Sequence, residues 1–146
     1  MWIEPKLWLN IEEKKMNSPS YDVKDMLEAE SALGLVFGTN LFIGSEPTNP
    51  KNTVTIFDIS GYPPQLTLTK GENYYYPSIQ IRIRNTSYAT GWSLIHDIME
   101  SLHGRSQETW NSTLYSVIRC SISPAFLDRD DNGLYRFVCT FDLQRR

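Results

Sequence analysis

The residues that come nearest to a known chemical site form a near-match to a calcium-binding loop. Four of them occupy the first, third, fifth and sixth positions of the pattern Asp-x-Asp/Asn-x-Asp/Asn-Gly: Asp128, Asp130, Asn132 and Gly133. Such a loop also needs a carboxylate at its twelfth position and a helix on each side. The twelfth position is Cys139, and the residues that follow the loop alternate as in a strand. We therefore predict no metal site here.

The same segment is better interpreted as a hairpin turn. Residues 134–143 have the two-residue period of a strand. One face of this strand is strongly apolar: Tyr135, Phe137, Cys139, Phe141 and Leu143. Asn132 and Gly133 both tolerate the positive φ angles of a two-residue hairpin turn, and nearby aspartates can hydrogen-bond the turn backbone. We expect residues 128–133 to join two antiparallel strands.

No other set of side chains predicts catalysis or a cofactor. His96 and His103 are seven residues apart on an expected helix, which separates them by about 10 Å, too far to share a metal ion. Zinc, phosphate-loop, dinucleotide and nucleophile-elbow motifs are all missing from the sequence. Cys120 and Cys139 fall in apolar, strand-like runs and are expected to be buried free thiols. We predict a protein that is not an enzyme.

Composition and charge favour a soluble globular domain. The 146 residues carry a net charge of −3, with a pI of about 5.4, whereas nucleic-acid binding needs clustered Lys and Arg. Apolar residues make up 40% of the sequence and aromatic residues 12%, which suits one core and a sheet-rich fold. There is no secretory leader and no apolar run long enough for a membrane helix. We expect cytoplasmic synthesis, no membrane contact and no sequence-specific nucleic-acid binding.

Two helices and several strands must position these residues. Helices are expected over residues 18–34 and 86–104, and strands over residues 39–44, 53–58, 78–84, 112–122 and 134–143. This order predicts a single α+β domain over residues 18–146, with a mostly antiparallel or mixed β-sheet and two main helices packed on one face. Residues 1–17 are an extension that either adds a strand or short helix to the body or forms an arm on a neighbouring subunit.

The second helix is expected to bury one stripe of side chains against the sheet. The stripe consists of Tyr88, Trp92, Ile95, Ile98, Met99 and Leu102. Gly91 lies inside the helix, where glycine costs about 1 kcal/mol relative to alanine. Its presence therefore indicates close packing at that point.

The strand over residues 78–84 predicts a sheet with one buried and one polar face. Ile79, Ile81 and Ile83 alternate along it with Gln80, Arg82 and Arg84. Arg119 and Arg136 could extend the polar face. This face could bind anions or nucleic acid, form ion pairs between subunits, or simply be solvated. The acidic composition argues against the first interpretation.

A long excursion over residues 59–77 separates two expected strands. It contains Tyr62, Tyr74, Tyr75 and Tyr76, and tyrosine provides a large contact area at a small entropic cost. Long ordered loops are often functional. The excursion is therefore either an interface arm or an ordinary loop that packs on its own subunit.

Residues 26–146 resemble the minor capsid or tail terminator proteins of long-tailed bacteriophages. The motifs that carry the resemblance are, in order, Gly38-Thr39, Leu41-Phe42, Gly44, Pro47, Asp58, Gly61-Tyr62-Pro63-Pro64, Pro77, Tyr88, Gly91, Leu102, Gly104, Leu127, Arg129-Asp130 and Asn132-Gly133. Asp128 departs from the pattern, because this family usually has glycine there. The polar loop after the second expected helix is a further departure.

The resemblance implies assembly rather than chemistry. Tail terminators form a homohexameric ring on the head-proximal end of the tail tube, which stops tube polymerisation and provides the surface for head–tail joining. The implied partners are other copies of the chain, the major tail tube protein and a head-completion or connector protein, with DNA passing through the ring. The implied location is the head–tail junction of the virion, after synthesis in the host bacterial cytoplasm.

Candidate contact residues follow from the loop, the turn and the arginine face. They are Tyr62, Tyr74, Tyr75, Tyr76, Arg82, Arg84, Arg119, Asp128, Arg129, Asp130 and Asn132. The alternative function within the virion is a head-completion or neck connector protein. An anion-binding module and an enzyme are the remaining alternatives.

Overall fold

The computed structural model of the chain describes residues 16–65 and 73–146, and residues 1–15 and 66–72 lie outside the description. Most of the expected N-terminal extension and the middle of the tyrosine-rich excursion are therefore outside it. The elements are α2 (Pro19–Ala29), the short 3₁₀ helix η1 (Ser31–Leu33), β1 (Leu41–Ile43), β2 (Thr53–Tyr62), β3 (Tyr76–Asn85), α3 (Tyr88–Leu102), β4 (Ser106–Trp110), β5 (Thr113–Arg129) and β6 (Tyr135–Arg145).

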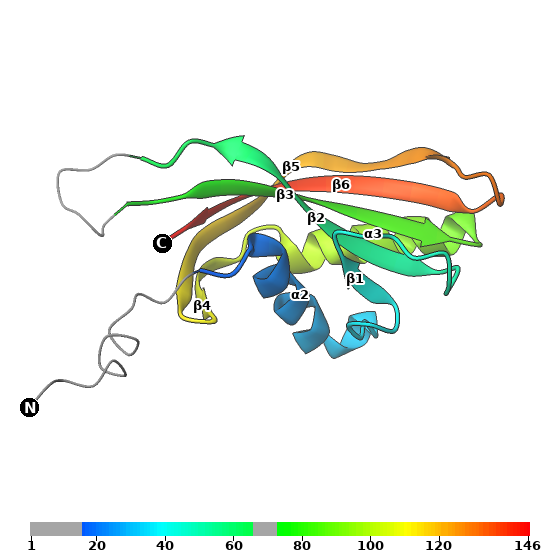
Figure 1. The fold of residues 1–146 in the computed structure, drawn as a ribbon, viewed down its shortest axis with the longest axis horizontal. Coiled ribbons are helices and arrows are strands. Elements are labelled where there is room, and N and C mark those ends of the chain that lie inside the picture. Colours follow the sequence, from blue (N-terminus) through cyan, green and yellow to red (C-terminus); the bar gives the residue numbers. More distant parts are fainter. Residues whose placement is uncertain (1–15, 66–72) are drawn as a thin grey trace, which may run out of the picture.

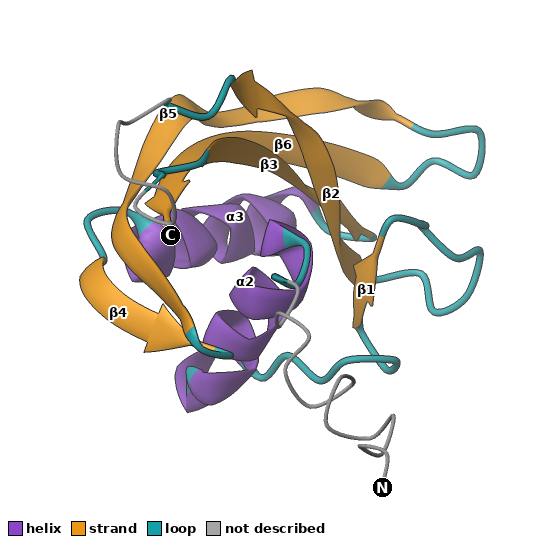
Figure 2. Cartoon of the chain, turned by 60° about the vertical axis from the view of Figure 1, so that its left-hand side comes forward, coloured by secondary structure: helices purple, strands orange, loops and turns teal. Residues whose placement is uncertain are grey.

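The strands form one six-stranded sheet in the order β1-β2-β3-β6-β5-β4. β1 runs parallel to β2, and every other neighbouring pair is antiparallel. Both helices lie on one side of the sheet, which curls around them (Figures 1 and 2). The predicted single α+β domain with a mixed sheet and two helices on one face is confirmed.

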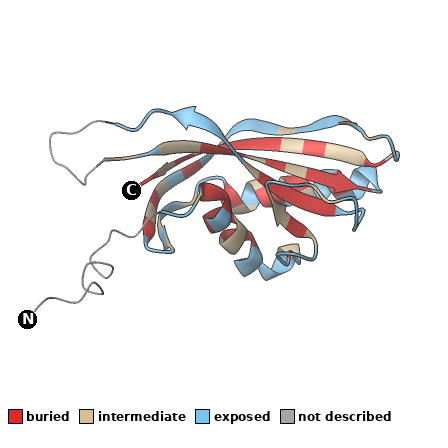
Figure 3. Ribbon diagram, viewed as in Figure 1, coloured by how far each residue is buried: buried red, intermediate tan, exposed pale blue. Residues whose placement is uncertain are grey.

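The core lies between the curled sheet and the two helices, as the buried stripes in Figure 3 show. Ile79, Ile81 and Ile83 are all fully buried, which confirms the predicted alternation along β3. Phe137, Cys139 and Phe141 of β6 are buried beside them; α3 packs on both strands, and α2 packs on β3. Each fully buried isoleucine contributes about 2 kcal/mol through the hydrophobic effect. This packing fixes the opposite side of the sheet, called the outer face below, as the side free of helices.

Helix α3 confirms the close packing predicted at Gly91. A Cβ atom placed there would lie 2.6 Å from Cε2 of Phe137, so the helix rests almost directly on β6. The predicted stripe is wrong at its start, because Tyr88 is 48% and Trp92 is 37% exposed. The physical reason is that the N-terminal part of α3 lies near the ends of β5 and β6, where Tyr88 packs on the rings of Phe126 and Tyr135 but stays partly open to solvent. Further along the helix, Ile95 and the later core positions Ile98 and Leu102 are buried.

β2, β3, β5 and β6 are longer than predicted, β1 is shorter than the strand predicted over residues 39–44, and β4 was not predicted. β2 continues to Tyr62 and β3 starts at Tyr76, so the ends of the predicted loop 59–77 belong to a long β2–β3 hairpin. β4 was expected to be a loop because its residues are mainly polar. It forms a hairpin with β5 through Asn111 and Ser112, which both have positive φ.

The segment 128–133 does join two antiparallel strands, but its turn differs from the predicted one. The amide of Gly133 donates to the carbonyl of Asp130, and only Gly133 of the pair Asn132-Gly133 has positive φ. The carboxylate of Asp130 accepts hydrogen bonds from the amides of Asn132 and Leu134, at 2.9 and 2.8 Å. Asp130 therefore acts as a structural residue of the turn, as the hairpin interpretation anticipated.

Candidate assembly surface

The clusters of titratable side chains in the described part of the chain tie elements of the fold together. Among the described residues, no group of three or more His, Cys, Asp or Glu side chains could hold a metal ion. Asp22 is fully buried at the start of α2, where it accepts hydrogen bonds from Tyr115 and Asn111. Burial and the adjacent Asp22 raise the pKa of Tyr115. Arg145 completes this cluster, which fastens α2 to the β4–β5 hairpin and to the end of β6.

No helix in the described part of the chain is long and apolar enough to cross a membrane.

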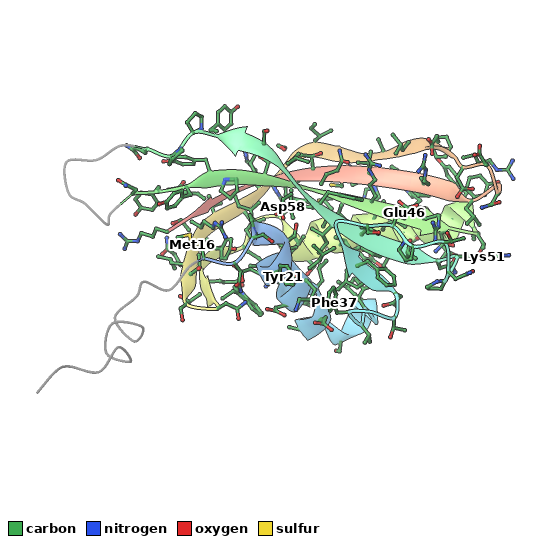
Figure 4. All side chains as sticks on the ribbon, in the orientation of Figure 1. Met16, Tyr21, Phe37, Glu46, Lys51 and Asp58 are labelled. Carbon is green, nitrogen blue, oxygen red and sulfur yellow. The ribbon has the colours of Figure 1, made fainter. Side chains whose placement is uncertain are left out.

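Arg84 does not belong to an exposed arginine face. It is only 6% exposed, because the loop between β1 and β2 folds over it. Its guanidinium donates to the carbonyls of Lys51 at 2.9 Å and Pro50 at 2.7 Å and pairs with Glu46 at 3.1 Å. Figure 4 labels Glu46 and Lys51 on that loop. Arg84 is thus a clamp for its own chain, which corrects the expectation that it projects freely from the sheet.

Arg136 and Arg82 lie on the outer face but also have partners within the chain. Arg136 makes two hydrogen bonds of 2.6 Å to the two carboxylate oxygens of Asp128 on the neighbouring strand. This pairing holds the pKa of Asp128 below its usual value and raises the pKa of Arg136. The Arg82 guanidinium lies 5.1 Å from the centre of the Phe57 ring. Both arginines are partly exposed, and the charge of Arg136 is already balanced by Asp128.

Arg129 is held against the 130–133 turn. Its Nε donates to the carbonyl of Gly133 at 3.1 Å, and its guanidinium lies 4.9 Å from the centre of the Tyr135 ring. Asp131 and Asn132 remain exposed at the tip. Among the predicted contact residues in this segment, Asn132 is therefore the one whose side chain is least engaged within the turn.

Two of the four predicted tyrosines meet Arg119 in a hollow on the outer face. The hollow has a volume of about 330 Å³ and is lined by side chains from four strands, among them Tyr62, Tyr76, Val117, Arg119 and Asp142. Arg119 is 3.1 Å from Asp142, and Tyr62 is 72% exposed. We call these five residues the tyrosine hollow. It combines aromatic area with one ion pair, which is typical of a surface that binds protein.

Tyr74 and Tyr75 are placed differently from the other two tyrosines. Tyr75 forms an isolated antiparallel bridge with Arg145, with backbone hydrogen bonds of 2.8 and 3.0 Å. The ring of Tyr74 lies 5.4 Å from the Arg146 guanidinium. These two tyrosines therefore hold the segment that leads into β3 against residues 145 and 146.

The predicted contact residues include few positions from the C-terminal half of β5, residues 121–129. β4 pairs with β5 only as far as Val117, and the Cys120 amide donates to Nδ1 of His103. From residue 121 onward, β5 has β6 on one side and, within the described chain, no neighbouring strand on the other side. We call residues 121–129 the open β5 edge.

The open β5 edge carries exposed apolar side chains. Ile122 is 59%, Phe126 45% and Leu127 41% exposed, and the Phe126 ring lies 5.7 Å from the ring of Tyr88 on α3. Unpaired strand edges with apolar side chains readily pair with other chains. Pro124 lies in the same segment, and proline is rare inside strands, so the sequence carries little signal for this edge.

Comparison with known protein families identifies the family of the chain. The family model described as bacteriophage tail terminator protein matches residues 30–145. The chain belongs to the bacteriophage tail terminator family. It is thus a structural protein of the phage virion, as the resemblance over residues 26–146 predicted.

Solved structures support the fold of this tail terminator. A chain from the structure of the virion of a native gene transfer agent particle has a TM-score of 0.62 at 13% identity, covering 88% of the tail terminator and 94% of that chain. A second solved chain has a TM-score of 0.52 at 6% identity, with coverage of 88% and 91%. At these identities the likeness concerns the fold alone. No curated protein gives a significant match to the tail terminator.

Proposed function

We propose that this protein caps the head-proximal end of the phage tail tube as a homohexameric ring. In this role it stops tube polymerisation and provides the surface to which a head-completion or connector protein binds. The observation that carries the proposal is the match of the tail terminator family over residues 30–145. The protein acts through contacts with copies of itself and with the major tail tube protein, and it performs no catalysis. Its place is the head–tail junction, and DNA passes through the ring.

The sheet offers two open edges on opposite sides, which suits head-to-tail association. On one side, β1 pairs with β2 only through residues 54–56, so β2 has no strand partner beyond them on that side in the described chain. On the other side lies the open β5 edge. A closed ring needs two different, complementary patches on every subunit. We assign the open β5 edge and residues 59–61 of β2 to these two patches.

The tyrosine hollow and the 130–133 turn are assigned to contacts with the tube or the connector. The hollow lies on the outer face, so both helices remain on the far side of the sheet. Tyr62, Tyr76 and Arg119 remain candidate contact residues, together with Arg82, Asp128 and Asn132. Arg84 is no longer among them, because its donors are used within the chain.

The test is electron microscopy of particles made by the parent phage with this gene disabled. Tails of uncontrolled length, detached from heads, are expected, because nothing would stop tube growth. Tails of normal length beside unjoined heads would instead assign the protein to the neck, as a head-completion connector. Supplying the intact gene in trans should restore both tail length and joining.

A further inference from the structure

Two cysteine side chains face each other between β5 and β6. The Sγ atoms of Cys120 and Cys139 are 3.6 Å apart, and each lies 3.4 Å from the carbonyl oxygen of Ile122. Both are free thiols. We propose that Cys120 and Cys139 form a reversible disulfide that fastens β5 to β6 beside the open β5 edge. This modification is independent of the proposed function, because it concerns the single folded chain.

The strand pairing brings these two thiols together. Cys120 is paired with Phe141 on β6, and Cys139 is the next residue of β6 on the same side of the sheet. Diagonal neighbours in a regular sheet are usually too far apart for a disulfide. Here the register between β5 and β6 shifts directly after Cys120 and again before Ala125. These shifts accompany the short distance between the two sulfur atoms.

The two sulfur atoms must come closer before a bond can form. A disulfide requires an S–S distance of about 2 Å, so the two atoms must move closer by about half of their present separation. Beyond Cys120, β5 is irregular and contains Pro124. On the edge opposite β6, this part of β5 has no strand partner within the described residues. Fewer hydrogen bonds hold this part of the backbone than in a central strand, so it can accommodate the shift.

The two thiols have different roles in the reaction. Cys120 is half-buried and Cys139 is fully buried. Burial and the neighbouring Cys120 raise the pKa of the Cys139 thiol, which keeps it protonated near neutral pH. Because the thiolate is the nucleophile in thiol–disulfide exchange, the first attack comes from Cys120.

With oxidised glutathione as the oxidant, the exchange proceeds in two balanced steps. The Cys120 thiolate attacks one sulfur of oxidised glutathione, which forms a mixed disulfide and releases one glutathione thiolate. Cys139 then gives up its proton to solvent and attacks Sγ of Cys120, which releases the second glutathione thiolate. Two protein thiols are oxidised and one molecule of oxidised glutathione is reduced to two thiols. The second step should be slow at neutral pH and faster at alkaline pH.

The test treats the folded full-length chain with oxidised glutathione and follows its intact mass. We expect the mass to fall by two hydrogen atoms, and proteolytic peptides containing Cys120 and Cys139 to be joined. The midpoint of thermal unfolding should rise by roughly 5 °C, because the crosslink restricts the unfolded chain, and return to its original value after reduction. Passage from reducing to oxidising surroundings would close such a bond in the same way.

Two single variants serve as controls. Cys139→Ala should retain one glutathione on Cys120 and show no loss of hydrogen. Cys120→Ala should react little, since its remaining thiol is buried. A wild-type chain that retains one glutathione, forms only intermolecular disulfides, or loses hydrogen only after unfolding in denaturant would overturn the proposal. A lower unfolding midpoint in the oxidised chain would overturn the fastening role.

Discussion

At the scale of single residues, Arg84 shows how a surface arginine of the sequence becomes a structural one. The alternation of β3 predicted correctly that Arg84 points away from the core, because strand periodicity is a local property. It could not predict that the loop between β1 and β2 folds back over the outer face. That loop contains Pro47 and Pro50, which favour turns but do not specify where the loop packs. The carbonyls that bind Arg84 come from residues more than 30 positions away.

We expect Arg84→Ala to lower the free energy of unfolding by about 2–4 kcal/mol. The reason is that several backbone carbonyls and the Glu46 carboxylate lose their donor in a nearly water-free site. Urea denaturation of the purified chain measures the loss. Arg119→Ala is the matched control, since Arg119 is 63% exposed at its side chain and makes one ion pair, and should cost less than about 1 kcal/mol. Equal losses of unfolding free energy in the two variants would show that the contacts of Arg84 stabilise the fold no more than an exposed ion pair does.

At the scale of elements, α3 and β6 meet at Gly91, and this contact gives the second prediction. Gly91→Ala should lower the free energy of unfolding by about 1–3 kcal/mol, although alanine favours a helix by about 1 kcal/mol. The added Cβ would lie 2.6 Å from Cε2 of Phe137 and 3.2 Å from Cβ of Asn85, so the helix must move away from the sheet. Thermal or urea unfolding measures the effect.

The control for Gly91 lies on the exposed face of the same helix. Ser93 is exposed, so Ser93→Ala gains helix propensity without a clash and should be neutral or slightly stabilising. If Gly91→Ala were as stable as Ser93→Ala, the tight contact between α3 and β6 would be refuted.

Elements with strong periodicity were predictable, and elements made by pairing were not. Ile79, Ile81 and Ile83 identify β3 because burial of one face imposes a two-residue period. β4 has no apolar face, and it becomes a strand only because Asn111 and Ser112 form a tight turn that places it beside β5. The extension of β2 to Tyr62 likewise depends on pairing with Tyr76. Such pairings are tertiary, so a single sequence shows them weakly.

The residues of the candidate site were likewise predictable only in part. Tyr62, Tyr76 and Arg119 were chosen for their residue types, and the structure brings them together in the tyrosine hollow. Ile122 and Phe126 were not chosen, because each lies two residues from Pro124, and single apolar residues near a proline give no surface signal. Their exposure depends on where β4 ends, which only the sheet topology determines.

At the scale of the whole molecule, the incompletely paired sheet is the feature that calls for partners. Monomeric proteins usually protect their strand edges with charges, bulges or covering segments. The open β5 edge has register shifts and one proline, yet its exposed side chains include Ile122, Phe126 and Leu127. In a head-to-tail ring, the next subunit would cover every such edge. The apolar edge that is exposed in a free chain would then form the contact between subunits, called the seam below.

We therefore expect Ile122→Lys to weaken assembly without unfolding the subunit. Ile122 is 59% exposed, so the lysine is solvated in the free chain, whereas in a covered seam its charge would be buried without a partner. The association between subunits should weaken by at least about tenfold. Sedimentation velocity with and without tail tubes measures association, and complementation of a phage lacking the gene should give overlong tails.

Ala32→Lys adds the same charge at an exposed position of η1, on the helix side of the sheet, and should complement normally. Normal tails from Ile122→Lys would show that the seam lies elsewhere, while unfolding of the free variant, detected by circular dichroism, would show that Ile122 supports its own subunit.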